Sequence, residues 1–519
     1  MGKDRVLMDN EAQGAINRRV AMHIRNWVSG WLTLAVFATV GGLVASDPAF
    51  AKVDMDSLTI GGEARIRYEG RINTSLNSNS TNESAASHRI RVNVGYDLTP
   101  DVSFFAQIQD ARIWGSEGPF GLSAATQSGI GAVSAQNQNG SGLDLHQGYI
   151  LIKNLGVPGL SLKAGRQEIM YGDHRLFGNF GWSQIGNSFD AVKLMYSTQL
   201  YDVDVFWARI FDTEVGGGCG ASNNNCSGVI FPANGQKGTT NQDIYGLYVT
   251  LKMVPNWTVE PYYFLLQDTR SAGLLAAAGC TTPCTFANTP QAPDQTRSTL
   301  GGRINGKALG FDATGELAWQ FGGIASGAAG QNHDLHINAE AAAFRAGYTF
   351  DPVPMKPRVG IEVDYASGSG CTTTCGKDNT FDNLFPTNHF HYGYMDLMAW
   401  KNMVGYSAVF DVKPDSVSKF QVNLWIFRLA NHHDNWYRAG QVVYGATNAA
   451  NTASSLGREL DVHYWRTFKE KFKAEIGVGH FWAGDYTRSA NLNNINGGGA
   501  GTTNGSGQSW GYLMGSVLF

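Results

Sequence analysis

Arginines occupy alternate positions in two neighbouring stretches of the chain, as Arg65 and Arg67 and again as Arg89 and Arg91. Alternate residues of an extended chain share one face, so the members of each pair point in the same direction. A guanidinium group keeps its charge and binds a carboxylate through two parallel hydrogen bonds. We therefore expect this cluster to contact an anionic solute, in preference to forming ion pairs within the protein.

Further cations occupy the polar faces of similar stretches, at Arg303, Arg358, Lys252 and Lys473. Rings of Arg or Lys are a recurring feature of anion-selective pores. The alternative is that each cation pairs with a carboxylate on a neighbouring strand, and for any single arginine we favour this interpretation. The carboxylates on the same faces are Glu63, Glu362, Asp364, Glu459, Asp461 and Glu475.

Motifs for covalent chemistry and nucleotide binding are absent from the sequence. It contains no Gly-x-Ser-x-Gly, no Walker loop and no His-Glu-x-x-His. Two histidine pairs, His389 with His391 and His432 with His433, are candidate metal ligands. For such loop histidines we favour contacts with aromatic rings or with the backbone. We predict no enzyme activity, no catalytic residue, no cofactor and no metal site.

The candidate side chains lie on stretches in which polar and apolar residues alternate. Strict alternation with a period of two indicates β-strands with one apolar and one polar face. A soluble sandwich shows the same pattern, so alternation alone does not say whether protein or lipid covers the apolar faces. These faces include Leu58, Ile60, Ile66 and Tyr68; Ile90, Val92, Val94 and Tyr96; Val359, Ile361, Val363 and Tyr365; and Phe472, Ile476 and Val478.

The connections between these stretches decide between the two architectures, because short and long ones alternate along the chain. Short turns are predicted at residues 99–101, 156–159, 198–199, 255–256, 305–306, 352–357, 413–415 and 469–471. Long Gly/Ser/Asn-rich stretches cover residues 69–87, 115–142, 171–188, 213–241, 269–296, 322–335, 367–401, 430–457 and 484–508. Tight periplasmic turns and long external loops are typical of transmembrane antiparallel β-barrels, and the connections give about 18 strands.

The composition supports an all-β chain without a nucleic-acid partner. Of the 519 residues, 43% are hydrophobic, 12% aromatic and only 16% charged, and 64 are glycine. This mixture favours strands and turns. The formal charge of -4 shows no excess of basic residues of the kind that nucleic-acid binding needs. Residues 510–519 form a predicted strand that ends on the aromatic Phe519, as the last strand of an outer-membrane barrel does.

The N-terminal residues have the features of a secretory signal. Basic residues precede an apolar run from Trp27 to Val44, and the small-x-small sequence Ala49-Phe50-Ala51 follows it. This order matches a signal peptide, with Met22 as an alternative start, whereas a permanent membrane helix is the competing interpretation. We predict a signal peptide over residues 1–51, one barrel domain over residues 52–519 and a location in the bacterial outer membrane.

Six cysteines fall into three close pairs: Cys219 with Cys226, Cys280 with Cys284 and Cys371 with Cys375. An even number at short spacing in an exported chain favours local disulfides. A metal site is the alternative, and it would need further ligands from another loop. We expect disulfides that close small external loops.

Two segments are denser in aromatic, glycine and charged residues than the other connections. The first runs Gly165-Arg-Gln-Glu-Ile-Met-Tyr-Gly-Asp-His-Arg-Leu-Phe-Gly178 and leads to Phe189-Asp190-Ala191. The second runs Phe381-Asp-Asn-Leu-Phe-Pro-Thr-Asn-His-Phe-His-Tyr-Gly-Tyr-Met-Asp396. In these segments and in its number of strands, the chain resembles the alginate export family of outer-membrane barrels.

The resemblance implies a monomeric barrel whose arginine-rich lumen passes a polyuronate outward. It implies that three residues of the first segment lie at the mouth or on the lumen wall: Arg166, Asp173 and Arg175. It implies that the second segment is an ordered external loop, with Asn388, His389, His391 and Asp396. Near Phe189-Asp190-Ala191 the family often has arginines where this chain has Asn187 and Lys193, and we include Lys193 among the pore candidates.

Taken together, these features predict a channel in the outer membrane. An anionic, alginate-like polysaccharide or small anionic solutes would pass by diffusion along the arginine-lined lumen. The alternative is a surface structural or adhesion barrel with a plugged lumen and partner-binding external loops. The expected partners are outer-membrane lipid and the anionic solute, and periplasmic export proteins are further candidates. We expect no nucleic-acid partner, and we expect the barrel to be a monomer.

Overall fold

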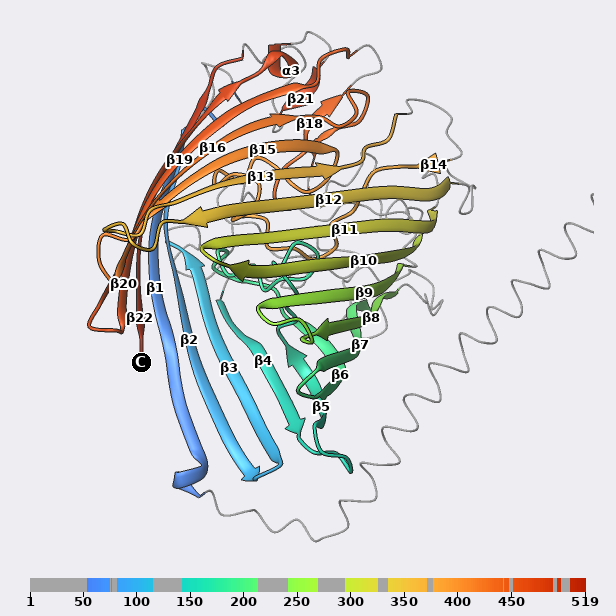
Figure 1. Cartoon of the computed structure of the whole chain (residues 1–519), viewed down its shortest axis with the longest axis vertical. Helices are drawn as coiled ribbons and strands as arrows, with labels where there is room; N and C mark the ends of the chain where they lie inside the picture. Colours follow the sequence, from blue (N-terminus) through green and yellow to red (C-terminus); the bar gives the residue numbers. More distant parts are fainter. Residues whose placement is uncertain are drawn as a thin grey trace, which may run out of the picture. The chain divides into compact units, whose positions relative to one another are not determined.

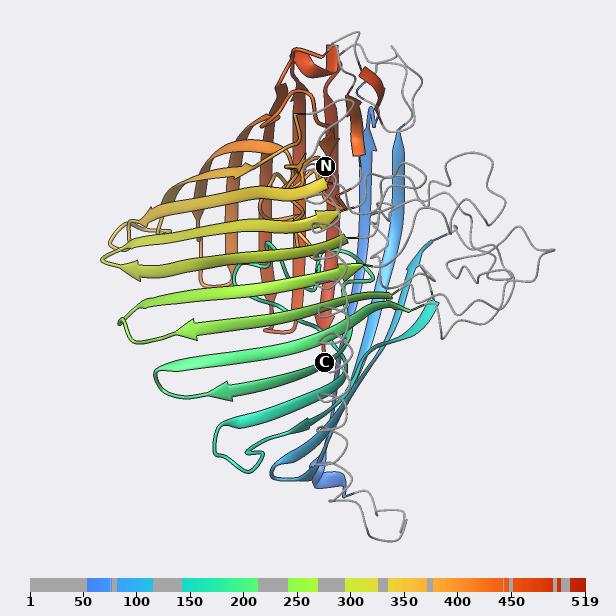
Figure 2. The same cartoon turned by 90° about the vertical axis from the view of Figure 1, so that its right-hand side faces the viewer.

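The long strands form one antiparallel sheet that closes on itself, as Figure 1 and Figure 2 show from two sides. The structure is a computed structural model that describes residues 54–74, 76, 82–114, 142–212, 241–268, 295–324, 335–370, 377–441, 443–447, 451–488, 492–495 and 505–519. Residues Asp56–Phe519 form one compact unit. Closure leaves the ring without a free sheet edge, which is the condition that lipid imposes on a membrane-spanning sheet.

Eighteen strands make the ring, and each pairs with the next one in the chain. β1 closes the ring against β22, in register from Glu63 with Leu518 to Ile72 with Ser509. The prediction of an all-β, antiparallel transmembrane barrel is therefore confirmed. The ring consists of β1 (Leu58–Ile72), β2 (Glu83–Thr99), β3 (Val102–Ile113), β4 (Gly142–Ile152), β5 (Leu160–Gln167), β6 (Phe189–Ser197), β7 (Tyr201–Asp212), β8 (Asn241–Leu251), β9 (Trp257–Asp268), β10 (Gln295–Ala308), β11 (Phe311–Ile324), β12 (Leu335–Thr349), β13 (Arg358–Ala366), β15 (Met403–Val412), β16 (Ser418–Arg428), β19 (Ser455–Phe468), β20 (Phe472–Ala483) and β22 (Gln508–Leu518).

A few short elements accompany the ring. Two of them are helical, η1 (Met55–Ser57) and α3 (Asp485–Arg488). Among the described residues, no helix has the length and apolar character needed to cross a membrane. The short strands are β14 (Lys377–Asp378), which pairs with β12, and a small separate sheet of β17 (Trp436–Tyr437), β18 (Val443–Thr447) and β21 (Leu492–Ile495).

The two faces of the barrel wall have the polarity of a membrane protein. On β1, Ile66 and Tyr68 are each 54% exposed on the outer face, whereas the intervening Arg67 is 1% exposed on the lumen face. A soluble protein would bury the apolar side chains and expose the arginine, so this arrangement is stable only when lipid covers the outer face. The strict alternation of the sequence produces it, because successive side chains of a strand point to opposite faces.

The connections at one end of the barrel are short and those at the other end are long, and we call these the turn end and the loop end. One predicted turn, at Asn305-Gly306, is wrong: both residues lie inside β10, and the turn is formed by Leu309 and Gly310, with φ of 52° and 84°. Glycine is needed at position 306 for close packing, because a Cβ there would come within 2.1 Å of the Trp257 ring.

The predicted signal peptide over residues 1–51 lies outside the described residues, and so do all six cysteines. At the other terminus, Phe519 extends the pairing of β22 beyond its last residue. Its N–H donates to the carbonyl oxygen of Gly62 at 3.1 Å, and its own carbonyl oxygen accepts from the N–H of Gly62 at 2.8 Å.

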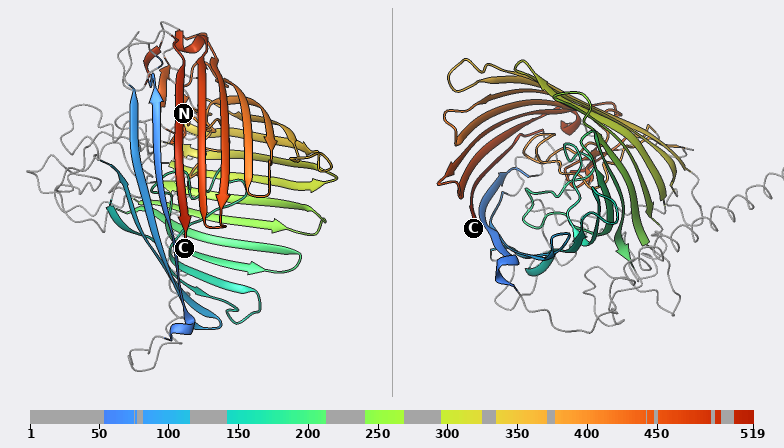
Figure 3. Two further views of the ribbon diagram at one scale, coloured as in Figure 1. Left: turned by 90° about the vertical axis from the view of Figure 1, so that its left-hand side faces the viewer. Right: turned by 60° about the horizontal axis from the view of Figure 1, so that its bottom comes forward.

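Two segments of chain lie inside the ring of strands, where Figure 3 shows them in the right-hand view. We call residues 168–188 the first inner loop and residues 377–402 the second inner loop. The second contains the segment that was expected to be an ordered external loop. That expectation is wrong in its location: the side chains of Tyr392, Met395 and Trp400 are fully buried, and the contacts described below tie the loop to the lumen wall.

Candidate functional site: the loop-lined lumen

The arginine cluster of β1 and β2 holds the first inner loop. Arg65 and Arg89 are cross-strand neighbours, and the side chains of Arg65, Arg67, Arg89 and Arg91 all point into the lumen. Two of them form ion pairs within the wall, Arg89 with Glu63 at 2.6 Å and Arg67 with Glu69 at 3.3 Å. All four donate to backbone carbonyl oxygens of the loop: Gly181 and Ser183 at 2.7 Å from Arg65, Trp182 at 2.7 Å from Arg67, Ser183 at 3.0 Å from Arg89 and Ile185 at 3.1 Å from Arg91. The loop therefore occupies the donors that we expected to meet an anionic solute. We call Arg65, Arg67, Arg89 and Arg91 the arginine wall.

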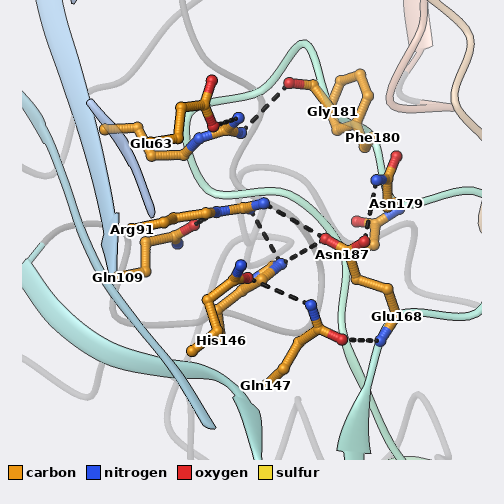
Figure 4. Close-up of polar contacts among 12 residues, drawn as sticks. Glu63, Arg91, Gln109, His146, Gln147, Glu168, Asn179, Phe180, Gly181 and Asn187 are labelled. Carbon is orange, nitrogen blue, oxygen red and sulfur yellow. Dashed lines mark hydrogen bonds and ion pairs between the residues drawn. The ribbon is translucent and has the colours of Figure 1, made fainter. Parts of the chain in front are cut away.

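A network around Glu168 anchors the start of the first inner loop, as Figure 4 shows. His146 Nε2 lies 2.9 Å from the Glu168 carboxylate, and Asn179 donates to it at 3.1 Å. Arg91 lies 3.4 Å from the same carboxylate and donates to Gln109 at 2.7 Å. Burial alone would raise the pKa of Glu168, but the hydrogen bond of His146 and the charge of Arg91 outweigh it and hold the pKa below its usual value. Glu168 is therefore a charged anchor.

Arg175 joins the first inner loop to the opposite wall and to the second inner loop. Its guanidinium donates to Asp364 on β13 at 2.9 Å, to Glu362 on the same strand, and to the Tyr392 hydroxyl of the second inner loop at 2.8 Å. The side chain is 2% exposed. Burial opposes the charge, but Asp364, Tyr392 and Glu362 raise the pKa of Arg175 well above its usual value. This residue lies within the lumen, but its donors face protein groups.

Asp173 forms a second anchor of the same loop. Its carboxylate lies 2.5 Å from Arg303 on β10 and 3.2 Å from Arg345 on β12. Burial would raise the pKa of Asp173, but the charges of Arg345 and Arg303 hold it below its usual value. Its carbonyl oxygen accepts a hydrogen bond from His391 of the second inner loop at 2.7 Å. Asp173 thus connects the wall and both inner loops.

The two inner loops pair directly with each other. The N–H of Gly178 donates to the carbonyl oxygen of Phe385, and the N–H of Phe385 donates to that of Leu176, both at 2.9 Å. Trp182 stacks on His389 with 3.9 Å between ring centroids and 8° between the ring planes. The two segments that stood out in the sequence are therefore partners in the structure, although the paired residues Gly178 and Phe385 are 207 positions apart in the chain.

Carboxylates on β19 hold the second inner loop from the other side. Glu459 accepts the N–H of Met395 at 3.0 Å, and Asp461 accepts the N–H of Tyr394 at 3.3 Å. Both carboxylates are fully buried. Arg71 of β1, which follows β20 and β22 around the ring, donates to the carbonyl oxygen of Met395 at 2.6 Å. We call Glu459 and Asp461 the carboxylate wall: it receives loop N–H groups, whereas the arginine wall donates to loop carbonyls.

The prediction that Arg166 lies at the mouth or on the lumen wall is wrong. It lies on the outer face of β5, where its cross-strand partner is Asp190, 65% exposed. The sequence contains a signal for this placement, because Arg166 shares its strand face with the apolar Leu162 and Ala164. Lys193, in contrast, lies on the lumen face, 2.8 Å from Asp204.

Another group of cations faces the lumen toward the turn end of the strands. We call them the turn-end cations. Arg358 lies between Asp312 at 2.7 Å and Asp411 at 3.3 Å, and Lys163 lies 3.8 Å from the centroid of the Tyr149 ring. The sequence analysis missed Lys163, Lys307 and Lys419 of this group and the loop anchor Arg345, although strand parity would have found them. The turn-end cations are Lys163, Lys193, Lys252, Lys307, Arg358, Lys419 and Lys473.

The candidate histidines have protein partners. His389 Nδ1 lies 3.0 Å from the Asp396 carboxylate, and His432 and His433 contact each other with 4.0 Å between ring centroids. Within the described part of the chain, no group of three or more His, Cys, Asp or Glu side chains is arranged to hold a metal ion.

The closed ring, its outward apolar faces and its inward loops define a porin-type outer-membrane barrel, and solved structures share this fold. OprD of Pseudomonas aeruginosa matches with a TM-score of 0.52 and 11% identity, over 91% of this chain and 97% of OprD. OccK8 (OprE) of the same organism matches with a TM-score of 0.51 and 10% identity, over 90% of this chain and 99% of that one. OccAB2 of Acinetobacter baumannii matches with a TM-score of 0.51 and 10% identity, over 89% and 98%.

The chain belongs to the alginate export family, whose model matches residues 56–498. The resemblance seen in the sequence and the location in the bacterial outer membrane are thereby confirmed. No curated protein matches the chain. Family and fold together place the protein among the outer-membrane channels for small solutes or polysaccharides. Since short turns are periplasmic in such barrels, the turn end is the periplasmic end.

Proposed function

We propose that this channel passes anionic solutes, including acidic polysaccharides of the alginate type, by diffusion. The observation that carries the proposal is the exposure of the turn-end cations. The side chains of Lys473 and Lys419 are 48% and 40% exposed and that of Lys307 is exposed as well, compared with 2% for Arg67 in the arginine wall. Exposed cations on the lumen face raise the local concentration of anions, as fixed charges lining a confined path do.

Carboxylates beside these cations favour diffusion of an anion through the lumen and disfavour its tight binding there. Lys419 lies 2.9 Å from Asp411, and Lys473 lies 2.5 Å from Glu475. A solute carboxylate that approaches such a lysine competes with a carboxylate already in place. The attraction is therefore weak enough for release, which conduction requires.

Ion selectivity in planar bilayers tests the proposal. We expect the purified barrel to conduct and its reversal potential in a KCl gradient to show a preference for anions. In the triple variant Lys307→Gln, Lys419→Gln and Lys473→Gln, this preference should fall while conductance persists. The matched control is Arg166→Gln, which removes an arginine from the outer face and should leave selectivity unchanged. Equal selectivity in the triple variant and the unmodified barrel would contradict the proposal.

The cargo is tested by blocking the open channel from the periplasmic side. Polyuronate oligomers should interrupt the current at lower concentration than neutral glycans of equal length, and this difference should shrink in the triple variant. Equal block by both glycans would leave size alone as the criterion for passage and would contradict a role for the cations.

A second candidate function is a structural barrel whose lumen is closed by the inner loops. The observation that favours it is that contacts join the loops to several strands of the wall, through the arginine wall, the carboxylate wall, Arg175 and Asp173. Complete absence of conductance in the unmodified barrel would favour this candidate over the channel.

A further inference from the structure

Two arginines are neighbours on the outer face of the barrel, at the loop end of two adjacent strands. Arg428 is the last residue of β16, and Arg458 is the fourth residue of β19. The direct cross-strand partner of Arg458 is Ile426, which stands two positions before Arg428 in the chain. The two arginines are therefore diagonal neighbours on one face of the sheet. We call Arg428 and Arg458 the outer arginine pair.

The outer arginine pair points away from the lumen. Both side chains are exposed. Ile426, on the same face of β16, is 45% exposed, whereas the next residue, Phe427, is fully buried on the lumen side. Because the protein lies in the bacterial outer membrane, the apolar part of this face is in contact with lipid.

A tryptophan indicates the height of the outer arginine pair in the membrane. Trp482, the second-last residue of β20, is the direct cross-strand partner of Arg458 and is 44% exposed on the same outer face. Outward aromatic residues form girdles at the two interfaces of a bilayer-spanning barrel. Long loops are external in such barrels. The outer arginine pair therefore lies at the level of the outer-leaflet headgroups.

The protein leaves most donors of the outer arginine pair unused. Among the described residues, Arg458 has no hydrogen-bond or ion-pair partner, and Arg428 donates one hydrogen bond, to the Ser454 hydroxyl at 3.1 Å. A guanidinium group has five N–H donors in a planar fork. Most of these donors therefore remain for a group outside the protein.

The outward faces of the three strands around the pair contain no carboxylate. The acidic neighbours of Arg458 on β19, Glu459 and Asp461, are fully buried on the lumen side. Asp485, which follows β20, lies 3.8 Å from Arg488. Every residue of β16, β19 and β20 is described, and their outward residues are Phe420, Val422, Leu424, Ile426 and Arg428; Arg458, Leu460, Val462, Tyr464 and Arg466; and Phe472, Ala474, Ile476, Val478, His480 and Trp482.

We propose that the outer arginine pair binds a phosphate group of an outer-leaflet glycolipid. The planar fork of a guanidinium group matches the geometry of phosphate oxygens and binds them through two parallel hydrogen bonds. The apolar residues that follow toward the turn end, such as Ile426 and Leu424, then face the acyl chains of the same lipid. This inference does not depend on what passes through the lumen.

Native mass spectrometry of the full-length barrel in detergent tests the proposal. The probe is bis-phosphorylated lipid A, and the same lipid after phosphate removal is the comparison. EDTA is present, so that divalent cations do not bridge carboxylates to the lipid. We expect the phosphorylated lipid to bind more tightly, and its affinity to fall about tenfold in the double variant Arg428→Gln and Arg458→Gln.

The matched control is Arg466→Gln. Arg466 lies on the same outer face of β19 but near the turn end, and its guanidinium lies 2.8 Å from the Asp415 carboxylate. Because this arginine already has an anionic partner in the protein, its removal should leave the affinity for lipid A unchanged. Heat-dependent mobility on gels verifies that each variant is a folded barrel.

Equal affinity of the two lipids for the unmodified barrel would overturn the proposal, because the phosphate would then contribute nothing. An affinity for the phosphorylated lipid that is unchanged in the double variant, or that falls equally in Arg466→Gln, would overturn it as well. If the double variant does not fold, each single variant is measured, and full affinity in both would have the same consequence.

Discussion

The arginine wall and the turn-end cations are made of the same kinds of side chain, but their surroundings differ. Arg65 and Arg67 are buried beneath the first inner loop and donate to its carbonyl oxygens, whereas Lys419 and Lys473 remain 40% and 48% exposed. A cation that points into a barrel is therefore not by itself a contact for solute. A cation covered by an inner loop stabilises the protein, whereas a cation exposed to the lumen is accessible to a passing solute.

The carboxylate wall extends this lesson to the opposite charge. Glu459 receives a backbone N–H of the second inner loop, just as Arg67 donates to a backbone carbonyl of the first. Each peptide unit has one donor and one acceptor that need partners when buried. A lumen with cations on one side and carboxylates on another can therefore hold irregular chain in place.

Removing Arg175 should have the largest effect on the loop-holding group. In Arg175→Met, Asp364 and Glu362 lose their buried partner, and removing one member of a buried ion pair costs about 3–5 kcal/mol. We expect faster hydrogen exchange throughout residues 168–188 and a lower unfolding temperature. Lys473→Met is the comparison. If both variants lose equal stability, the distinction between holding and exposed cations is wrong.

Removing two residues of the arginine wall should have the second-largest effect on stability. Arg65→Met with Arg89→Met removes hydrogen bonds from charged donors to Gly181 and Ser183, each worth roughly 1.5–3 kcal/mol. We expect more current fluctuation in single-channel recordings, as the first inner loop loosens, with little change in ion selectivity. If selectivity changed as much as in the turn-end triple variant, Arg65 and Arg89 would be solute contacts, and their assignment to the arginine wall as loop-holding residues would be wrong.

The carboxylate wall should respond to the loss of an acceptor more than to the loss of charge. Glu459→Ala leaves the Met395 N–H without its partner, at a cost of about 1–3 kcal/mol. Glu459→Gln keeps an oxygen that can accept this N–H and should cost less. Exchange rates of the Tyr394 and Met395 amides measure the difference. Greater loss in the glutamine variant would show that charge matters more than the hydrogen bond.

Acidification should loosen the first inner loop. The pKa values of Glu168 and Asp173 lie below their usual values of 4.5 and 3.8, so their charged forms stabilise the folded state. This stabilisation is present above pH 4.5 and is lost as the pH falls through the lowered pKa values. Hydrogen exchange of residues 168–188 should accelerate there. In Glu168→Gln with Asp173→Asn the acceleration should shrink, and an unchanged pH profile would assign it to other groups.

The smallest effect on stability is expected for the exposed cations. Lys419→Gln breaks an ion pair in which the lysine is 40% exposed, and Asp411 keeps Arg358 as a partner at 3.3 Å. Pairs that involve an exposed cation contribute about 0–1 kcal/mol. Thermal unfolding should be nearly unchanged, whereas anion preference should fall measurably. A large loss of stability in this variant would place Lys419 with the loop-holding residues.

Much of the barrel could be predicted because alternation is a local property of the chain. The faces of β1 follow from residues 58–72 alone, and the wrong turn at Asn305-Gly306 arose because a sequence typical of tight turns lies opposite Trp257, where only glycine fits. Arg166 was assigned to the lumen by resemblance, although its own strand places it with Leu162 on the outer face. Local parity was the better guide at that residue.

The sequence by itself determined the strands, their lipid-facing and lumen-facing sides, the alternation of turns and loops and the family. Only the tertiary structure decided that the second inner loop lies inside the ring and that the arginine wall holds the first. The physical reason is that these contacts join groups far apart in the chain, such as Met395 with Arg71 and Glu459. The donors and acceptors involved are backbone groups, which every residue carries and which leave no mark on the sequence.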